Sequence, residues 1–91
     1  MMRYEFRWNA WNVEHIDRHG VLPEEAEYVV QHPGRGFPRS IGRDKALVHG
    51  RTLAGRYIQA IYIFSPPGVV FVVHARPLND AEKRNLRRRS P

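Results

Sequence analysis

The chain contains 91 residues, enough for one compact domain and too few for two, because domains usually span roughly 50–200 residues. Hydrophobic residues make up 42% of it, which permits a buried core and excludes wholesale disorder. The absence of cysteine excludes a disulfide scaffold, a thiolate nucleophile and a thiolate-bound zinc ion.

Charge is the most informative feature of the composition. Fifteen Lys and Arg residues against nine Asp and Glu residues give a net charge of +6. Residues 1–27 hold three basic and six acidic groups, whereas residues 28–91 hold twelve basic and three acidic groups. Thirteen of the fifteen basic residues are Arg, whose planar guanidinium binds phosphate in a bidentate manner, although a G+C-rich genome would explain this bias as well. We expect an anionic partner, with RNA, DNA and an acidic protein all open.

The longest apolar stretches, residues 58–64 and 69–73, are far shorter than the ~20 residues that a membrane-spanning helix needs. We therefore expect a cytoplasmic protein with no membrane partner. We also expect a single domain over residues 1–91, in which the Arg-rich residues 87–91 form a frayed tail.

Periodicity and capping residues predict the first two elements. Residues 4–8 place aromatic side chains at every second position, the spacing of a half-buried strand. Asn9 then favours the N-cap of a helix over residues 10–19, which Gly20 ends in the left-handed conformation that glycine adopts easily.

A second helix is predicted to begin at Pro23, because the acidic residues after it suit the positive end of a helix dipole, and to end at Pro33. Residues 32–45 contain two Pro and three Gly, so this segment is either a loop or a ragged edge strand. Arg39 and Arg43 lie on it, where they serve either as RNA contacts or for solubility.

Three runs with β character follow, over residues 46–52, 56–64 and 69–76. Their short connections predict an antiparallel meander. Asn79 and Glu82 then form a capping-box pattern that opens a final helix. This order predicts an α+β fold: a small antiparallel sheet of about four strands, with two N-terminal helices and one C-terminal helix packed on one face and the other face partly open.

Strand alternation assigns the polar side chains of these runs to faces of the sheet. In the third run, His74 and Arg76 are predicted to share a face with Val70 and Val72. Tight hairpins and antiparallel pairing bring the basic ends of the three runs together. The residues expected to converge at this end of the sheet are Arg51, Arg56, His74 and Arg76.

Such a cluster suits RNA cleavage by the neighbouring 2′-hydroxyl. A base removes the hydroxyl proton, an acid protonates the leaving 5′-oxygen and Arg side chains stabilise the negative phosphorane, so no metal or cofactor is needed. His74 titrates near neutral pH and is the candidate base, with Arg56 and Arg76 as catalytic groups beside it. Alternatively, His74 only ends a strand and Arg76 pairs with Glu82. Arg51, predicted to bind RNA, and Arg56 would then be solvated hairpin residues.

His15 and His19 lie four residues apart on the first predicted helix, a spacing that two ligands of one metal ion can have. No third ligand cluster accompanies them, so we expect no metal site, and the position of His19 near a helix C-terminus explains it better. Arg18 and His19 are instead expected to reach RNA. Candidates for base stacking, although aromatic residues at such spacings more often belong to the core, are Trp8, Trp11, Phe37 and Tyr57.

Several short segments, weak singly but specific as an ordered set, extend along nearly the whole chain. They are Tyr4-Glu5-Phe6-Arg7-Trp8-Asn9 with Asn12, Arg18-His19-Gly20-Val21, Pro23-Glu24-Glu25-Ala26, the Gly50-Arg51-Thr52 and Gly55-Arg56 pair, and Ala75-Arg76 before Glu82-Lys83-Arg84. This ordered set resembles the BrnT family of toxins. The resemblance implies a RelE-like fold and a metal-independent ribonuclease that inhibits translation by cutting RNA.

The resemblance also implies a partner, a small BrnA-type ribbon-helix-helix antitoxin that neutralises the toxin and contacts operator DNA, so that the toxin meets DNA only indirectly. The basic functional residues of the family fall on the Arg18-His19 corner, Arg56 and Arg76. Two positions depart from the family: His74 stands where Ser is usual, and Leu86 where many members have Tyr. A non-catalytic module that binds nucleic acid or docks onto an acidic protein is the competing interpretation.

Overall fold

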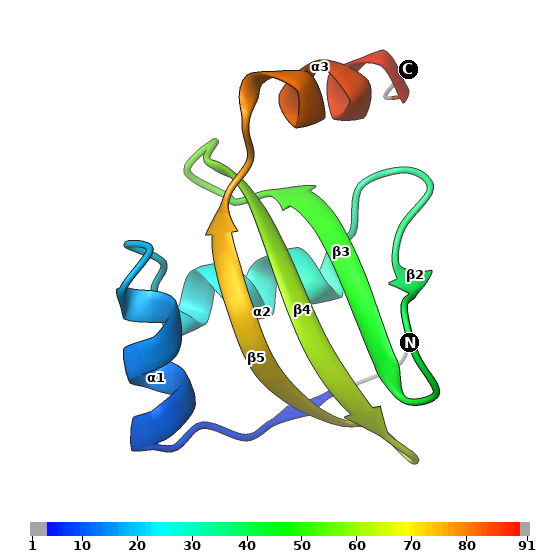
Figure 1. Ribbon diagram of the computed structural model, residues 1–91. Helices are drawn as coiled ribbons and strands as arrows, with labels where there is room; N and C mark the ends of the chain where they lie inside the picture. The colour runs from blue at the N-terminus through cyan, green and yellow to red at the C-terminus, as the bar shows by residue number, and fades with distance from the viewer. Residues whose placement is uncertain (1–3, 90–91) are drawn as a thin grey trace.

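The computed structural model describes residues 4–89, which form an α+β fold of three helices and a five-stranded sheet (Figure 1). In chain order the elements are β1 (Glu5–Phe6), α1 (Ala10–Asp17), α2 (Pro23–Gln31), β2 (Arg39–Ser40), β3 (Lys45–Arg51), β4 (Tyr57–Ser65), β5 (Val69–Pro77) and α3 (Asp80–Arg89). The strand order is β1-β5-β4-β3-β2, and every neighbouring pair is antiparallel except β1 with β5. The α+β prediction is confirmed, and the segment left open as a loop or edge strand contributes β2.

Short-range signals set the helix boundaries. The side chain of Asn9 accepts a hydrogen bond from the backbone N–H of Asn12 at 3.1 Å, and the Asn12 side chain accepts one from the backbone N–H of Asn9 at 2.7 Å. The same reciprocal arrangement joins Asn79 and Glu82 at the start of α3. Gly20 adopts a φ of +71°, so the chain turns after α1 as expected.

The C-terminal end differs from the prediction. Residues 87–89 were expected to belong to a frayed tail, but they continue α3 to Arg89. Residues 90–91 lie outside the described part of the chain. The basic last turn of α3 suits the negative end of the helix dipole, which explains why three consecutive Arg residues are compatible with helix there.

The hydrophobic core lies between the sheet and the first two helices. At the crossing of α2 over β3, a Cβ atom on Gly50 would lie 2.8 Å from a methyl group of Val29, so only glycine allows this close approach. Within residues 4–89 no helix has both the length and the apolar character that crossing a membrane requires. The core side chains are Ile16, Val21, Ala26, Val29, Val30, Val48, Ile58, Ala60, Tyr62, Val70, Val72 and Ala75.

A bulge in β5 determines the face on which its polar side chains lie. Val72 and His74 pair with consecutive residues of β4, so β5 contains one extra residue between them. Beyond the bulge the alternation is reversed: Ala75 is buried in the core, and His74 and Arg76 lie on the opposite face. The prediction that His74 and Arg76 share a face with Val70 and Val72 is therefore wrong, because a bulge shifts the register by one residue.

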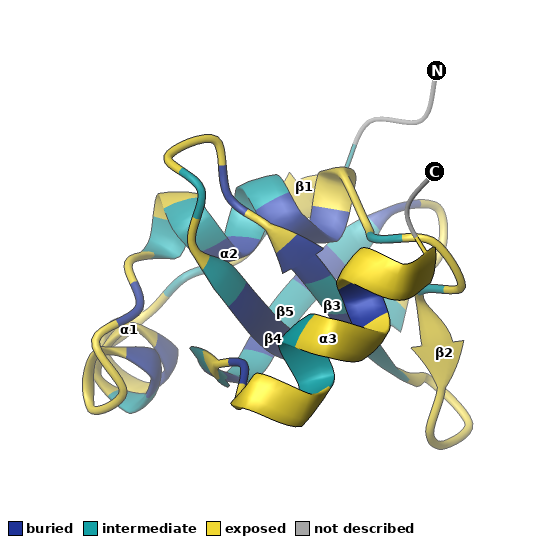
Figure 2. Cartoon of the chain, turned by 90° about the horizontal axis from the view of Figure 1, so that it is seen from above, coloured by how far each residue is buried: buried dark blue, intermediate teal, exposed yellow. Residues whose placement is uncertain are grey.

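We call the sheet face opposite α2 the open face. Helix α2 and helix α3 lie on opposite sides of strands β3–β5, and α1 lies beside β5 (Figure 2). This corrects the expectation that all helices pack on one face. Helix α3 covers only one end of the open face, and Leu86 is its single buried residue.

Candidate functional site

Two imidazole rings meet where the connection after α1 reaches β5. The ring centroids of His19 and His74 are 5.2 Å apart, and the ring planes form an angle of 67°. Burial lowers the pKa of His74, and the nearby His19, Arg76 and His15 lower it further. His74 is therefore predominantly neutral at pH 7, the form that accepts a proton. Because imidazole both accepts and donates protons near this pH, the pair suits general acid–base chemistry.

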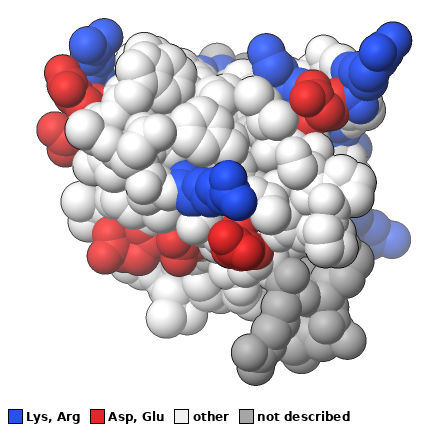
Figure 3. Space-filling view, turned by 90° about the horizontal axis from the view of Figure 1, so that it is seen from below, with Lys and Arg blue, Asp and Glu red and all other residues white. Residues whose placement is uncertain are grey.

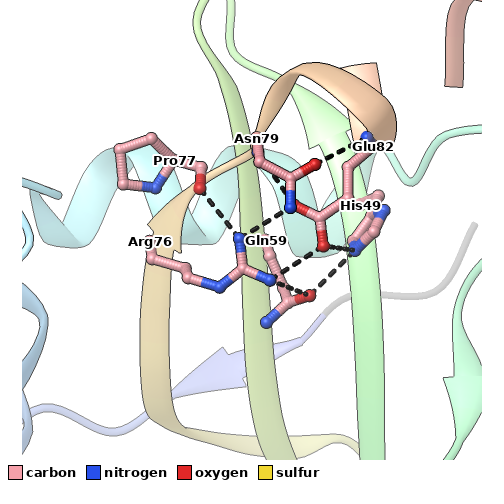
Figure 4. A network of polar contacts seen from close by, with 6 residues as sticks. All are labelled: His49, Gln59, Arg76, Pro77, Asn79 and Glu82. Carbon is pink, nitrogen blue, oxygen red and sulfur yellow. Dashed lines mark hydrogen bonds and ion pairs between the residues drawn. The ribbon is translucent and has the colours of Figure 1, made fainter. Parts of the chain in front are cut away.

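Arg76 lies two residues beyond His74 in a polar network that spans three strands and α3 (Figure 4). Its guanidinium donates to both carboxylate oxygens of Glu82 at 2.8 Å and to the side-chain oxygen of Gln59 at 3.2 Å. The Nε2 atom of His49 lies 2.8 Å from the same Gln59 oxygen and 4.0 Å from Glu82. The sequence-based alternative in which Arg76 pairs with Glu82 is thus confirmed.

This network strongly favours the ionised form of the Glu82 carboxylate. The hydrogen bond from Arg76 lowers the pKa of Glu82 to about 2, against the opposing effect of burial. The same bond raises the pKa of Arg76. Glu82 therefore contributes stability that is fully present above the ordinary glutamate pKa, near 4.3, and that is lost as the pH falls toward 2.

We expect Glu82→Gln to lower the free energy of unfolding at pH 7 by about 1–3 kcal/mol, because Arg76 would lose its charged partner in a partly buried position. Urea denaturation at pH 7, and at steps from pH 5 to pH 2, measures this. The variant should lose less stability than the parent over the acidic range. Glu14→Gln, at an exposed ion pair with Arg18, is the control and should change stability by less than about 0.5 kcal/mol. Equal stability of Glu82→Gln and the parent at pH 7 would contradict the assignment.

Arg56 does not join this cluster. Its guanidinium donates to the Glu25 carboxylate of α2 at 2.8 and 3.0 Å and to the backbone carbonyl of Gly20 at 3.0 Å. It therefore lies on the α2 side of the sheet, whereas His74 and Arg76 lie on the open face. The expected convergence of all four residues is wrong for Arg56, because consecutive strand residues point to opposite faces. Its contact with Gly20 holds the corner that follows His19 against the start of β4.

The other predicted RNA contacts are spread over the surface. Arg51 is exposed at the end of β3, on the open face. Arg18 is exposed and forms a long ion pair with Glu14 at 3.7 Å. Arg39 and Arg43 are exposed on and after β2, at the opposite edge of the sheet from β5. The structure thus brings His19, His74 and Arg76 together and places Arg51 on the same face, whereas the other four predicted site residues, Arg18, Arg39, Arg43 and Arg56, lie elsewhere.

Two of the candidate stacking residues belong to α1 or precede it. The indole N–H of Trp8 donates to the Glu27 carboxylate at 2.7 Å, so this ring links β1 to α2. Trp11 is 52% exposed, but its ring stacks on His15 at 4.4 Å and lies parallel to Phe71 at 6.1 Å. These neighbours explain both rings as packing elements, and the exposed part of Trp11 lies next to His15.

Phe37 stacks on His49, with ring centroids 4.6 Å apart, and the Arg39 guanidinium lies 4.5 Å from its ring centre. These residues border a small cavity of about 90 Å³ beside α3. His49 and Gln59 are functional candidates that sequence reasoning did not select. The available signal was the alternation that puts His49 on the same strand face as Arg51.

An open cavity lies apart from the histidine pair, and neither His19 nor His74 lines it. It has a volume of about 500 Å³ and lies between β2, the turn into β3 and the end of β4. Within the same residues no group of three or more His, Asp or Glu side chains is arranged to bind a metal ion. The side chains that line the open cavity include Tyr4, Arg39, Arg43, Lys45, Tyr62 and Phe64.

No protein-family model matches the chain, and no curated protein or solved structure matches it either. The geometry of the His19–His74 pair and of the Arg76 network therefore supplies the grounds for assigning a function.

Proposed function

We propose that this protein is a ribonuclease that cleaves RNA by attack of the 2′-hydroxyl on the adjacent phosphate, without a metal ion or other cofactor. The observation that carries the proposal is the His19–His74 pair, two imidazoles 5.2 Å apart at the surface with Arg76 nearby. Imidazole accepts a proton in its neutral form and donates one in its protonated form, so two neighbouring imidazoles can fill the roles of base and acid that this reaction needs.

In the proposed reaction His74 accepts the proton of the 2′-hydroxyl, and the 2′-oxygen forms a bond to phosphorus. The bond from phosphorus to the 5′-oxygen breaks, and His19 donates a proton to that oxygen as it leaves. The products are a 2′,3′-cyclic phosphate and a 5′-hydroxyl. Because the charge of Arg76 is already offset by Glu82, Arg76 contributes less to charge neutralisation than a free guanidinium would and mainly fixes the polar surface beside the phosphate.

Incubation of purified protein with labelled single-stranded RNA in EDTA tests the proposal. We expect cleavage that yields 2′,3′-cyclic phosphate ends, since no step needs a metal ion. Heat-unfolded protein is the control for contaminating nucleases. RNA that remains intact over a range of pH from 5.5 to 8.5 would refute a ribonuclease, provided that the protein is folded.

A second candidate function is RNA binding without cleavage. One observation favours it: the bidentate pair of Arg76 with Glu82 occupies the guanidinium that was predicted to be catalytic. Retention of RNA that weakens with increasing salt, without cleavage, would support this function instead. A surface that only docks onto an acidic protein would show neither cleavage nor RNA retention.

We extend the proposal to a cytoplasmic toxin neutralised by a BrnA-type ribbon-helix-helix antitoxin. Its support is the ordered set of segments that resembles the BrnT family, together with the net charge of +6, which favours an acidic partner. Growth arrest on expression of this chain alone, relieved by co-expression of a ribbon-helix-helix protein encoded beside it, would support this extension. Unimpaired growth at a high level of expression would contradict it.

A further inference from the structure

At the end of the open face, two guanidinium groups lie close to the ring of Tyr57. The central guanidinium carbon of Arg51 lies 5.4 Å from the centre of the Tyr57 ring, and that of Arg87 lies 5.8 Å from it. Arg51 ends β3 and pairs with Tyr57 in the sheet register, whereas Arg87 belongs to the last turn of α3. Two elements far apart in sequence therefore present their basic side chains at one ring. We call these three residues the guanidinium clamp.

Among the described residues, Arg7, Arg18, Arg56 and Arg76 each form an ion pair with a carboxylate, whereas several other basic side chains, those of the clamp included, form none. On the face seen from below, basic side chains lie next to acidic ones (Figure 3). Arg7, for example, forms an ion pair with Glu5. Within residues 4–89 neither Arg51 nor Arg87 forms an ion pair. The two positive charges, which lie 5.4 and 5.8 Å from the same ring centre, repel each other, and an anion bound beside both adds attractive interactions that offset this repulsion. The clamp is therefore complementary to a phosphate group.

The strand register places the clamp in line with the histidine pair. Arg76 lies two residues beyond His74 on β5 and pairs with Gln59 of β4. Tyr57 lies two residues further in the same direction, on the same face. The displacement along the strands is about 13 Å, four residues at the rise of a β-strand. A few nucleotides of extended single-stranded RNA cover this distance.

We propose that Arg51, Tyr57 and Arg87 bind a phosphate of the RNA substrate that is not cleaved, a few nucleotides from the bond at the His19–His74 pair. This inference rests on the proposed ribonuclease function. The clamp does not touch the reacting atoms, so it acts on substrate binding rather than on the chemical step. A dinucleotide at the histidine pair is too short to reach it, whereas a longer RNA engages both.

The experiment compares a dinucleotide with a ten-nucleotide RNA that contains the same single cleavable bond. For the double variant Arg51→Gln, Arg87→Gln, we expect KM for the longer RNA to rise by about tenfold or more while kcat is kept. The ratio of kcat/KM for the longer RNA to kcat/KM for the dinucleotide should fall by the same factor. The dependence of RNA affinity on salt should weaken by about 0.7 per lost contact. Arg84→Gln, Arg88→Gln, two exposed residues of the same helix, is the charge-matched control and should leave KM close to that of the parent.

A double variant that keeps the parental KM for the longer RNA would overturn the clamp. An equal change for both substrates, or a loss confined to kcat, would overturn it as well. If the parent protein cleaves no RNA, the proposed function fails. The affinity of the parent and the double variant for labelled RNA then tests the clamp separately. Unchanged affinity and salt dependence in the double variant would then refute it, whereas a selective loss relative to the control variant would sustain it as an RNA phosphate site.

Discussion

The variant His74→Gln is expected to cleave RNA about 10²–10⁴-fold more slowly than the parent, because the proposed reaction uses the neutral imidazole of His74 to accept the proton of the 2′-hydroxyl. His19→Gln is expected to slow cleavage by a similar factor, since the proposed reaction assigns the role of acid to His19. Single-turnover cleavage of a labelled RNA at saturating protein measures both rates. His32→Gln is the matched control: His32 stacks on Tyr28 at the end of α2, and its replacement should leave the rate unchanged.

The variant His74→Gln should also differ from the parent in how its free energy of unfolding depends on pH, and a contaminating nuclease cannot produce this difference. The pKa of His74 is lower in the folded protein than the ordinary value near 6.5, so the unfolded chain binds a proton more readily. The free energy of unfolding therefore falls as the pH drops below about 6.5, until the folded pKa is passed. In His74→Gln this part of the decrease should be absent. A full cleavage rate in folded His74→Gln would refute the role of this residue.

The variant Asn12→Ala is expected to lower the free energy of unfolding by about 2–4 kcal/mol. Asn12 is fully buried, and its amide nitrogen donates to the carbonyl oxygens of Arg7 at 3.0 Å and of Val72 at 3.1 Å. Its side-chain oxygen accepts the backbone N–H of Asn9. Alanine would leave these backbone groups without partners, at the edge of β5 and at the helix cap.

Urea denaturation at pH 7 measures this loss. Asn85→Ala on α3 is the control, because Asn85 is exposed and the substitution should cost less than about 0.5 kcal/mol. A loss below 1 kcal/mol for Asn12→Ala would show that water replaces the missing bonds. Since Asn12 holds α1 against β5, the variant should also disturb the position of His19 and slow cleavage.

Much of the fold follows from neighbouring residues in the chain. Asn9 and Asn79 cap helices through contacts three residues away, and Pro23 begins α2. Such signals act within one helical turn and can be recognised without tertiary structure. The strand runs 46–52, 56–64 and 69–76 were likewise recognisable from their composition and short connections, and each corresponds to an observed strand within one residue at either end.

Only part of the candidate site could be predicted from the sequence. Imidazole and guanidinium groups have distinctive chemistry, so the sequence indicated His74, Arg76 and His19 as candidates. It assigned His19 to RNA contact rather than to a partnership with His74. No periodic signal joins two residues 55 positions apart, and their contact depends on how the corner after α1 packs against β5.

The amino-acid sequence by itself therefore determined the α+β class and the order of every element except β2, whose segment it left open as a loop or an edge strand, because capping and alternation are local interactions. Tertiary structure alone decided which residues meet. The bulge before His74 reverses a face, the path of α3 onto the open face joins Glu82 to Arg76 and Arg87 to Tyr57, and Arg56 turns toward Glu25. Each of these depends on the free energy of packing distant segments, which the pattern of neighbouring residues does not contain.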